Sequence, residues 1–350
     1  MPGTNDPPKG GLRRQGAREM TIGRRLVMMF IPAVLTVGLA EVALRLADWP
    51  KKDAAREFVH NEVYWKEPAS LHLEPIAHKE TGGSFRVSTD ANGLRAPLHA
   101  EEKPAGTFRV MTLGCSTTFG WGVDDADSYP AQLETRLHER GRASVEVVNG
   151  GQPGHSSFQG LWLWENVLQR YHPDLVVFGY IVQDARKVAY SDRSQAVLQG
   201  NAEFLKQNIL YQSRLYLGLK VALGGWQIEQ KDKAATVYRV PPDEYVENLR
   251  AFQKKVEAAG ARFVLFGFPL EGAGYTADHR NILHSYADVE KVPLYDPQPE
   301  FERYSSQRTL YFPQDRGHAN ADGNALIASG MADWLETSAL LPTTNGATGP

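Results

Sequence analysis

The sequence predicts an α/β fold of the flavodoxin-like type, a three-layer sandwich around a central parallel sheet of about five strands, preceded by an N-terminal transmembrane helix. From residue 107 onward, almost continuously apolar runs alternate with amphipathic segments of helical period. Strands of this kind are covered by helices on both faces. The length of 350 residues suits one large domain with extensions. A long apolar stretch near the N-terminus has the length of a membrane span.

The expected strands are the apolar runs FRVMTLG, VEVVNGG, PDLVVFGY, ARFVLFGF and VPLYDP. Between them, apolar residues recur three and four positions apart, which is the period of a helix with one buried face. The helices expected from this period cover residues 128–141, 157–171, 241–260 and 320–340, and Asn320 caps the last one. In such a sheet, substrates bind at the carboxyl ends of the strands. Residues that follow a strand are therefore the first candidates for chemistry.

Other segments flank or interrupt this domain, which we place at residues 106–339. An insertion at about 186–240 is longer than a minimal crossover between strands, and we expect helices around residues 202–223 within it. The segment 49–105 contains the alternating run SFRVSTD and turn residues, which predict a short β element among loops. The chain ends are predicted to be a disordered basic leader over residues 1–22 and a disordered tail over residues 340–350.

Residues 23–48 are predicted to be a transmembrane signal-anchor. The apolar run that starts at Leu26 provides roughly the 20 residues that a membrane-spanning helix needs. Arg24 and Arg25 precede the run, so we expect a single-pass membrane protein with its N-terminus in the cytoplasm and its domain in the periplasm. Two alternatives stay open: a cleaved signal peptide, and a chain that begins at Met20 rather than at the first residue.

Composition excludes several classes of function. The net charge is -3, with both signs mixed along the chain, so no basic surface for nucleic acid is expected. The single cysteine excludes an intramolecular disulfide framework and a cysteine-based zinc site. The acyl chemistry considered below requires no metal and no organic cofactor, so none is expected.

Two candidate nucleophiles, Cys115 and Ser116, lie side by side after the first strand. Ser116 is expected to open the next helical turn, where backbone N–H groups and the helix dipole favour a developing negative charge. Side-chain alternation turns Cys115 the other way, into the packing at the strand end. The sequence therefore favours Ser116 as an acyl-carrying nucleophile.

A serine needs a base, and histidine is the usual one because it titrates near neutral pH. Of ten histidines, only His318 has an aspartate three residues before it, Asp315. An acid at that spacing can bind the distal ring nitrogen and stabilise the imidazolium that forms during acyl transfer. The pair precedes the last helix, and we expect it on a loop at the carboxyl edge of the sheet.

Gly154, in the run VVNGGQPGHSS after the second strand, is a candidate oxyanion donor because no side chain obstructs its N–H. The alternative is a simple turn before a helix. The run lacks the lysine of a P-loop and the spacing of a dinucleotide-binding loop, so nucleotide binding is not expected.

LGCSTTFGWGVDDADSYPAQLE, VVNGGQPGHSSFQGL, PDLVVFGYIVQDA and DRGHANADGNALIA resemble, in order, the blocks of the SGNH/GDSL hydrolase superfamily. The resemblance covers roughly residues 85–338, and VSTDANGLR is similar to the lead-in segment of membrane-anchored members. It implies a serine ester hydrolase in which Ser116 is the nucleophile, His318 the general base and Asp315 its partner. It also implies that the N–H groups of Ser116 and Gly154 form part of an oxyanion hole.

The third block departs from the family pattern. The family has an asparagine, whose side-chain amide completes the oxyanion hole, where this sequence has Gln183. Glutamine keeps the donor group but adds a methylene. We expect Gln183 to serve as the donor; the alternative is a bystander role. Losing one such donor typically costs about 2.7–4 kcal/mol of transition-state stabilisation.

The expected function is a serine-dependent O-acyl ester hydrolase outside the cytoplasm, acting through a Ser116 acyl-enzyme on a small acyl ester such as an acetylated cell-envelope glycan. One alternative is an O-acetyltransferase that decorates an extracytoplasmic polysaccharide and works with polysaccharide-biosynthesis partners, for which tethering to the membrane is an advantage. The other is a catalytically silent binding module on the same fold, suggested by Gln183.

Overall fold

The computed structural model describes residues 21–50, 75–78, 83–200, 210–219, 221–222, 235–313 and 315–342. The chain divides into two units, of which one comprises residues 1–58 and 204–224 and the other residues 59–203 and 225–350. The predicted leader and tail lie mostly outside the described residues.

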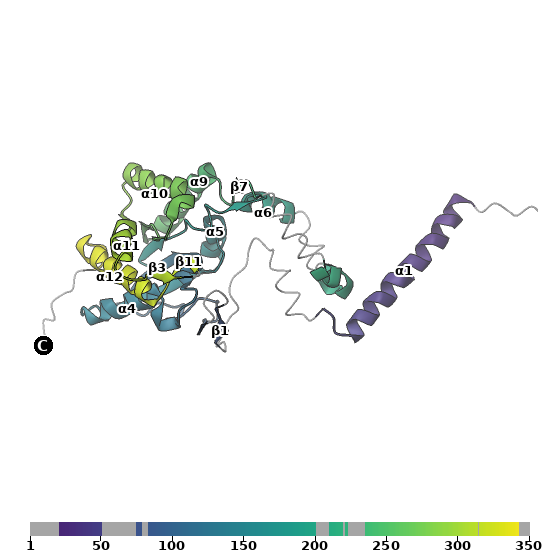
Figure 1. The fold of residues 1–350 in the computed structure, drawn as a ribbon, viewed down its shortest axis with the longest axis horizontal. Coiled ribbons are helices and arrows are strands. Elements are labelled where there is room, and N and C mark those ends of the chain that lie inside the picture. Colours follow the sequence, from purple (N-terminus) through teal and green to yellow (C-terminus); the bar gives the residue numbers. More distant parts are fainter. Residues whose placement is uncertain are drawn as a thin grey trace, which may run out of the picture. The chain divides into compact units, whose positions relative to one another are not determined.

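A five-stranded parallel sheet forms the centre of the second unit (Figure 1). Its strands, in spatial order, are β4 (Val145–Gly151), β3 (Phe108–Gly114), β5 (Leu175–Phe178), β8 (Arg262–Phe266) and β9 (Leu294–Tyr295). Numbered along the chain, this is the order 2-1-3-4-5, which confirms the predicted flavodoxin-like class. The direction of winding reverses between β3 and β5, so the carboxyl ends of these two strands mark the expected substrate site.

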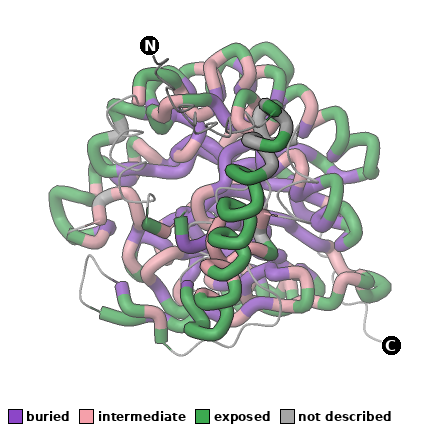
Figure 2. Tube along the Cα trace, turned by 90° about the vertical axis from the view of Figure 1, so that its right-hand side faces the viewer, coloured by how far each residue is buried: buried purple, intermediate pink, exposed green. Residues whose placement is uncertain are grey.

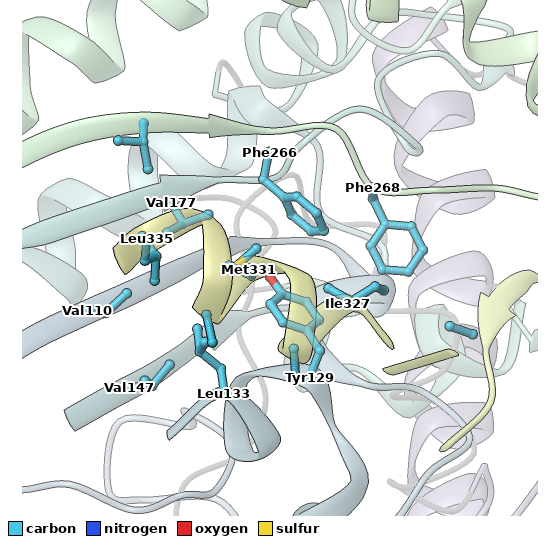
Figure 3. Close-up of a cluster of buried hydrophobic side chains, with 14 of the residues drawn as sticks. Val110, Tyr129, Leu133, Val147, Val177, Phe266, Phe268, Ile327, Met331 and Leu335 are labelled. Carbon is cyan, nitrogen blue, oxygen red and sulfur yellow. The ribbon is translucent and has the colours of Figure 1, made fainter. Parts of the chain in front are cut away.

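Helices cover both faces of the sheet, as the near-continuous apolar strands require. Successive strand residues point to opposite faces, so Val110, Val177 and Phe266 belong to one apolar cluster while Met111, Val176 and Leu265 belong to the other. Figure 3 shows the first cluster, in which Leu133, Met331 and Leu335 complete the packing. The helices on that face are α4 (Tyr129–Glu139), α11 (Gln298–Ser305) and α12 (Ala321–Thr337), and those on the opposite face are α5 (Ser157–Asn166), α9 (Pro242–Ala258) and α10 (Ala277–Glu290).

The helices predicted from apolar periodicity are confirmed, with shifted ends. Asn320 caps α12 through a side-chain oxygen that accepts from the N–H of Gly323 at 2.9 Å. The helix expected over residues 157–171 is wrong in its second half, because α5 ends at Asn166 and the 3-10 turn η2 (Leu168–Tyr171) follows. The sequence did not predict α10 and α11.

The two ends of the insertion pair with each other as short antiparallel strands, β6 (Lys187–Val188) and β7 (Val237–Tyr238), and α6 (Asp192–Gly200) follows β6. The predicted helices around residues 202–223 fall partly outside the described residues. Within the described part there is a 3-10 turn, η3 (Leu210–Gln212), followed by helical residues 214–219.

The segment before the domain contains a small antiparallel pair, β1 (Ile76–Ala77) and β2 (Ser84–Phe85). Short 3-10 turns, η1 (Asp125–Asp127) and η4 (Ala273–Thr276), complete the described elements around the sheet, together with the short helix α3 (Ser116–Phe119) and the antiparallel pair of β10 (Tyr311–Phe312) and β11 (Asp315–Ala319).

The first unit is built on α1 (Ile22–Leu46), a helix of 25 residues. Its stretch Met28–Leu46 has a mean hydropathy of 1.8 and is 0% buried, so it is long and apolar enough to cross a membrane (Figure 2). Near the end of α1, the Glu41 carboxylate accepts from the Ser213 hydroxyl and from the N–H groups of Arg214 and Leu215, at 2.8–2.9 Å. These bonds join the outer part of the insertion to the helix.

Candidate active site

Ser116 is the first residue of α3 (Ser116–Phe119), as the sequence predicted, and only Cys115 separates it from the end of β3. Close packing holds this short helix against the sheet. A Cβ on Gly114 would lie 2.1 Å from Thr118 Oγ1, and a Cβ on Gly151 would lie 2.3 Å from the nitrogen of Phe119. Only glycine at both strand ends leaves room for α3, so the sheet fixes the position of Ser116.

Arg95, from the segment before the domain, holds the chain where it leaves α3. Its fully buried guanidinium donates to the carbonyl oxygens of Phe119, Gly120 and Val123 at 2.5–2.8 Å, and to the Asp125 carboxylate at 2.8 Å. Since a buried guanidinium must have its donors satisfied, these bonds lock the loop behind the candidate nucleophile. The run VSTDANGLR therefore has a structural role at the site.

His318 and Asp315 lie on β11 (Asp315–Ala319), which pairs with β10 (Tyr311–Phe312). The expectation of a loop here is wrong. The hairpin is irregular, since Tyr311 pairs with Ala319 and Phe312 with Asp315. In a regular strand, residues three apart point to opposite faces. The irregularity is what allows the His318 and Asp315 side chains to meet.

The structure brings Ser116, His318 and Asp315 together. His318 Nε2 lies 2.7 Å from Ser116 Oγ, and His318 Nδ1 lies 2.6 Å from Asp315 Oδ2. Burial raises the pKa of Asp315, but the His318 hydrogen bond and the charges of His318 and His78 outweigh it, and the pKa is lower than usual. Asp315 is therefore ionised at neutral pH and can stabilise a protonated His318.

His78, which no sequence pattern indicated, also lies beside the Asp315 carboxylate. Its Nε2 is 3.6 Å from Asp315 Oδ2, its side chain is buried, and its ring lies 4.8 Å from that of Phe312. It comes from the segment that precedes the domain, far from Asp315 in the chain, so no local motif signals it.

A pocket of about 270 Å³ opens beside these groups. It is lined by Ser116, Val182, Gln183, Arg186, Tyr275, Gly317 and His318. Gln183, at the carboxyl end of β5, thus shares a pocket with Ser116. Arg186 and Tyr275 were not predicted, because neither stands in a recognisable motif.

Gly154 is not part of this lining. It has a positive φ of 78°, a conformation that favours glycine. Its carbonyl oxygen accepts a hydrogen bond from Arg239, which follows β7. Arg239 also contacts Gln183, so the insertion reaches two of the three residues that the sequence assigns to the oxyanion hole.

Cys115 is fully buried in the cluster of the first face, and its Sγ lies 3.2 Å from Thr117 Oγ1. Burial raises the pKa of its thiol above the usual value. A protonated thiol is a poor nucleophile, so Cys115 is placed for packing.

Asp184, next to Gln183, is a buried carboxylate that the sequence analysis missed. It accepts from the N–H and the hydroxyl of Ser157, at the start of α5. Burial raises its pKa from the ordinary value near 3.8 to about 6, although the hydrogen bonds from Ser157 work in the opposite direction.

The raised pKa of Asp184 predicts that the unfolding free energy of the protein depends on pH. An acid whose folded pKa is raised stabilises the fold fully below its unfolded pKa, and that contribution is lost as the pH rises through the folded pKa. From pH 4 to pH 6, the unfolding free energy of the wild type, measured relative to Asp184→Asn, should fall by about 2 kcal/mol. Urea unfolding of both proteins over this range tests it. A difference that is constant with pH would contradict it.

Among the residues that the structure describes, no group of three or more histidine, cysteine, aspartate or glutamate side chains is placed to hold a metal ion. His279 is buried, with its Nε2 2.8 Å from the carbonyl oxygen of Val240, and His284 lies 2.8 Å from Asp296. His279 belongs to the buried face of α10, whereas His284 is exposed on the same helix.

Residues 112–326 match the sequence profile of the GDSL-like Lipase/Acylhydrolase family. No curated protein matches the chain. Among solved structures, the chain is similar to a lipase/acylhydrolase from Enterococcus faecalis (14% identity, TM-score 0.46, covering 66% of this chain and 97% of that one). It is also similar to the esterase EstA from Pseudoalteromonas sp. (15% identity, TM-score 0.45, covering 67% of this chain and 99% of that one). A third similar structure is an acetylxylan esterase from Geobacillus stearothermophilus (16% identity, TM-score 0.45, covering 66% of this chain and 95% of that one).

Proposed function

Because the chain belongs to the GDSL-like lipase/acylhydrolase family, we propose that it is a serine-dependent O-acyl ester hydrolase that acts on a short acyl ester outside the cytoplasm. One observation carries the proposal, the continuous relay from Ser116 Oγ to His318 Nε2 at 2.7 Å and from His318 Nδ1 to Asp315 Oδ2 at 2.6 Å. This relay has the parts that acyl transfer needs: a nucleophile, a base and a group that orients the base.

In the first half of the reaction, Ser116 Oγ attacks the ester carbonyl carbon and its proton passes to His318 Nε2. Asp315 holds the other ring nitrogen and stabilises the imidazolium. The N–H groups of Ser116 and Gly154 and the amide of Gln183 bind the oxyanion. When the bond to the alcohol oxygen breaks, His318 gives its proton to the leaving alcohol.

In the second half, a water molecule gives its proton to His318 and attacks the acyl carbon. The bond to Ser116 Oγ breaks, the acid leaves, and the proton returns from His318 to Ser116. Every proton transfer uses the same histidine, so no metal or organic cofactor enters the scheme.

The size of the pocket supports a short acyl group. Its volume of about 270 Å³ is below the range of roughly 300–1,000 Å³ that is usual for small-molecule sites. Tyr275, which lines the pocket and is 48% exposed, presents a ring on which the sugar part of an acylated glycan can pack. The natural ester in this proposal is an O-acylated glycan of the cell envelope.

The short-chain preference is measurable. We expect kcat/KM of the full-length protein for p-nitrophenyl acetate to exceed that for the octanoate by at least about tenfold. Tyr275→Ala, which widens the pocket, should reduce this ratio. Tyr190→Ala, at an exposed tyrosine outside the pocket lining, is the matched control and should leave it unchanged. Equal or faster hydrolysis of the octanoate by the wild type would contradict a short acyl substrate.

The location outside the cytoplasm is supported by α1. The helix is exposed and apolar, and Arg24 lies at its N-terminal end, the charge distribution of a helix whose N-terminus stays in the cytoplasm. An alkaline phosphatase fused after residue 342 is expected to be active in bacterial cells, and the chain is expected to resist extraction from membranes at alkaline pH. An inactive but intact fusion would contradict this orientation.

A further inference from the structure

Arg239 is the centre of a polar cluster behind the pocket wall. Its Nε donates to Asp192 at 2.8 and 3.0 Å, and its Nη2 donates to Gln159 Oε1 at 2.6 Å. Its Nη1 donates to Gln183 Oε1 at 3.1 Å and to the carbonyl oxygen of Gly154. One planar guanidinium thus binds a carboxylate, a backbone carbonyl and two side-chain amides, a geometry that arginine provides and lysine does not.

The contact with Gln183 fixes which end of the amide faces the pocket. A side-chain amide has its oxygen and its NH₂ group on opposite sides of the same carbon. Arg239 holds the oxygen, and Gln183 lines the pocket that contains Ser116 and His318. The NH₂ group, which is the donor an oxyanion needs, is then the end left to face the pocket.

We infer that Arg239 is a positioning residue of the oxyanion hole: it orients the Gln183 amide, so that the NH₂ group faces the pocket. The inference rests on the proposed function. It gives the insertion a role in the reaction, since Arg239 follows β7 and Asp192 begins α6.

This role explains how glutamine works at a position where the family resemblance leads us to expect asparagine. The extra methylene adds a rotatable bond and lengthens the reach of the donor. A charged hydrogen bond on the oxygen removes that freedom. The Arg239 guanidinium keeps a fixed position because its partner Asp192 is almost completely buried, with its side chain 4% exposed.

Asp192 is fixed in turn. Its Oδ2 accepts from the Ser156 hydroxyl at 2.5 Å, and its backbone N–H donates to the carbonyl oxygen of Arg239 at 2.9 Å. Gln159 Oε1, a second acceptor for Arg239, also accepts from the N–H of Ser156 in the capping box of α5. The start of α5, the insertion and the pocket wall are therefore one connected polar network.

The test compares variants of the full-length protein with p-nitrophenyl acetate. The double variant Arg239→Met with Asp192→Asn removes both charges, so neither is left buried without a partner. It is expected to lower kcat by about tenfold to a hundredfold, up to the lower end of the range for complete loss of one oxyanion donor, and to change KM by less than about threefold. Arg239→Lys, which keeps the charge without the planar fork, should give a smaller loss of kcat.

Repeating these variants in a Gln183→Ala background separates positioning from support of the fold. If Arg239 acts through Gln183, the double variant should lower kcat there by less than about threefold, because coupled residues are not additive. A purely structural role predicts the same loss in both backgrounds, and that result would overturn the inference. If the double variant fails to fold, as judged by circular dichroism, the loss of kcat caused by Arg239→Lys is compared between the wild-type and Gln183→Ala backgrounds instead. An equal loss in both backgrounds then overturns the inference.

Arg193→Met is the matched control. Arg193 belongs to the same insertion and pairs with Glu247 at 2.8 Å, away from the pocket lining, so its loss should leave kcat unchanged. Ser116→Ala distinguishes a failure of the proposed function from a failure of the role of Arg239. If the wild type shows no hydrolysis that depends on Ser116, the proposed function fails. If Ser116-dependent hydrolysis is present but unaffected by the Arg239 variants, only the role of Arg239 fails.

Discussion

Replacing Ser116 by alanine is expected to lower kcat for p-nitrophenyl acetate by roughly a million-fold, the loss that follows when a hydroxyl nucleophile is removed from a complete catalytic relay. Ser116 Oγ is the only atom of the relay that bonds to the acyl carbon, and it lies 2.7 Å from His318 Nε2. The binding groups of the pocket remain, so KM should change little. Steady-state kinetics measure the loss, and mass spectrometry of fluorophosphonate-treated protein shows whether Ser116 carries the label.

Cys115→Ala is the control for this prediction, because it removes the neighbouring nucleophilic atom and leaves Ser116 in place. Cys115 is fully buried in the apolar cluster, so the variant should lose about 1 kcal/mol of unfolding free energy through the small cavity it leaves. Its kcat and its labelling should stay close to those of the wild type. If Ser116→Ala still hydrolysed the ester or accepted the label, Ser116 would not be the nucleophile.

Replacing Asp315 by asparagine is expected to lower kcat by about ten-thousandfold, with the fold intact. The carboxylate accepts the Nδ1 proton of His318 at 2.6 Å and thereby keeps Nε2 free to take the proton of Ser116. An asparagine amide that donates to Nδ1 stabilises the other tautomer, in which Nε2 already carries a proton. Steady-state kinetics of the purified variant at neutral pH measure the effect.

Stability measurements test the ionisation of Asp315 separately from catalysis. Its pKa is lower than the ordinary value near 3.8, because the hydrogen bond and charge of His318 and the charge of His78 outweigh burial, which acts in the opposite direction. Its contribution is then present above the unfolded pKa and lost as the pH falls through the folded pKa. The stability difference between wild type and Asp315→Asn should shrink as the pH falls from about 5 to below about 4.

Asp322→Asn is the matched control for both measurements, since Asp322 is an exposed aspartate in the first turn of α12. Its kcat should stay near that of the wild type. A loss of less than about tenfold in Asp315→Asn would remove Asp315 from the relay.

Elements with a regular apolar pattern were predictable, and elements without one were not. The strands and α4, α9 and α12 have buried residues at the spacing that their geometry demands. In α10 the buried stripe includes His279, and His284 stands among its exposed residues, so no apolar period of that kind marks the helix. The β10–β11 pair escaped prediction because its irregular register leaves no alternation to detect.

The residues of the site also divide into those that a local sequence pattern marks and those that it does not. Ser116 after a strand, and Asp315 with His318 at a fixed spacing, are local patterns, so they were identified before the fold was known. Arg239 stands in no motif, and its partners Gln183 and Gly154 are 56 and 85 positions away. His78 and Arg186 likewise stand in no motif, because only their neighbours in the folded structure connect them with the site.

The sequence by itself determined the succession of the five strands of the sheet and of α4, α9 and α12, the apolar helix near the N-terminus, and which residues have the chemistry for acyl transfer. These are properties of neighbouring residues, and backbone geometry converts them directly into structure. Only the tertiary structure decided that Ser116 and His318, 202 positions apart, lie 2.7 Å from each other, and that an arginine from the insertion holds the Gln183 amide. Such contacts form only when the buried faces of distant elements pack, so no local pattern contains them.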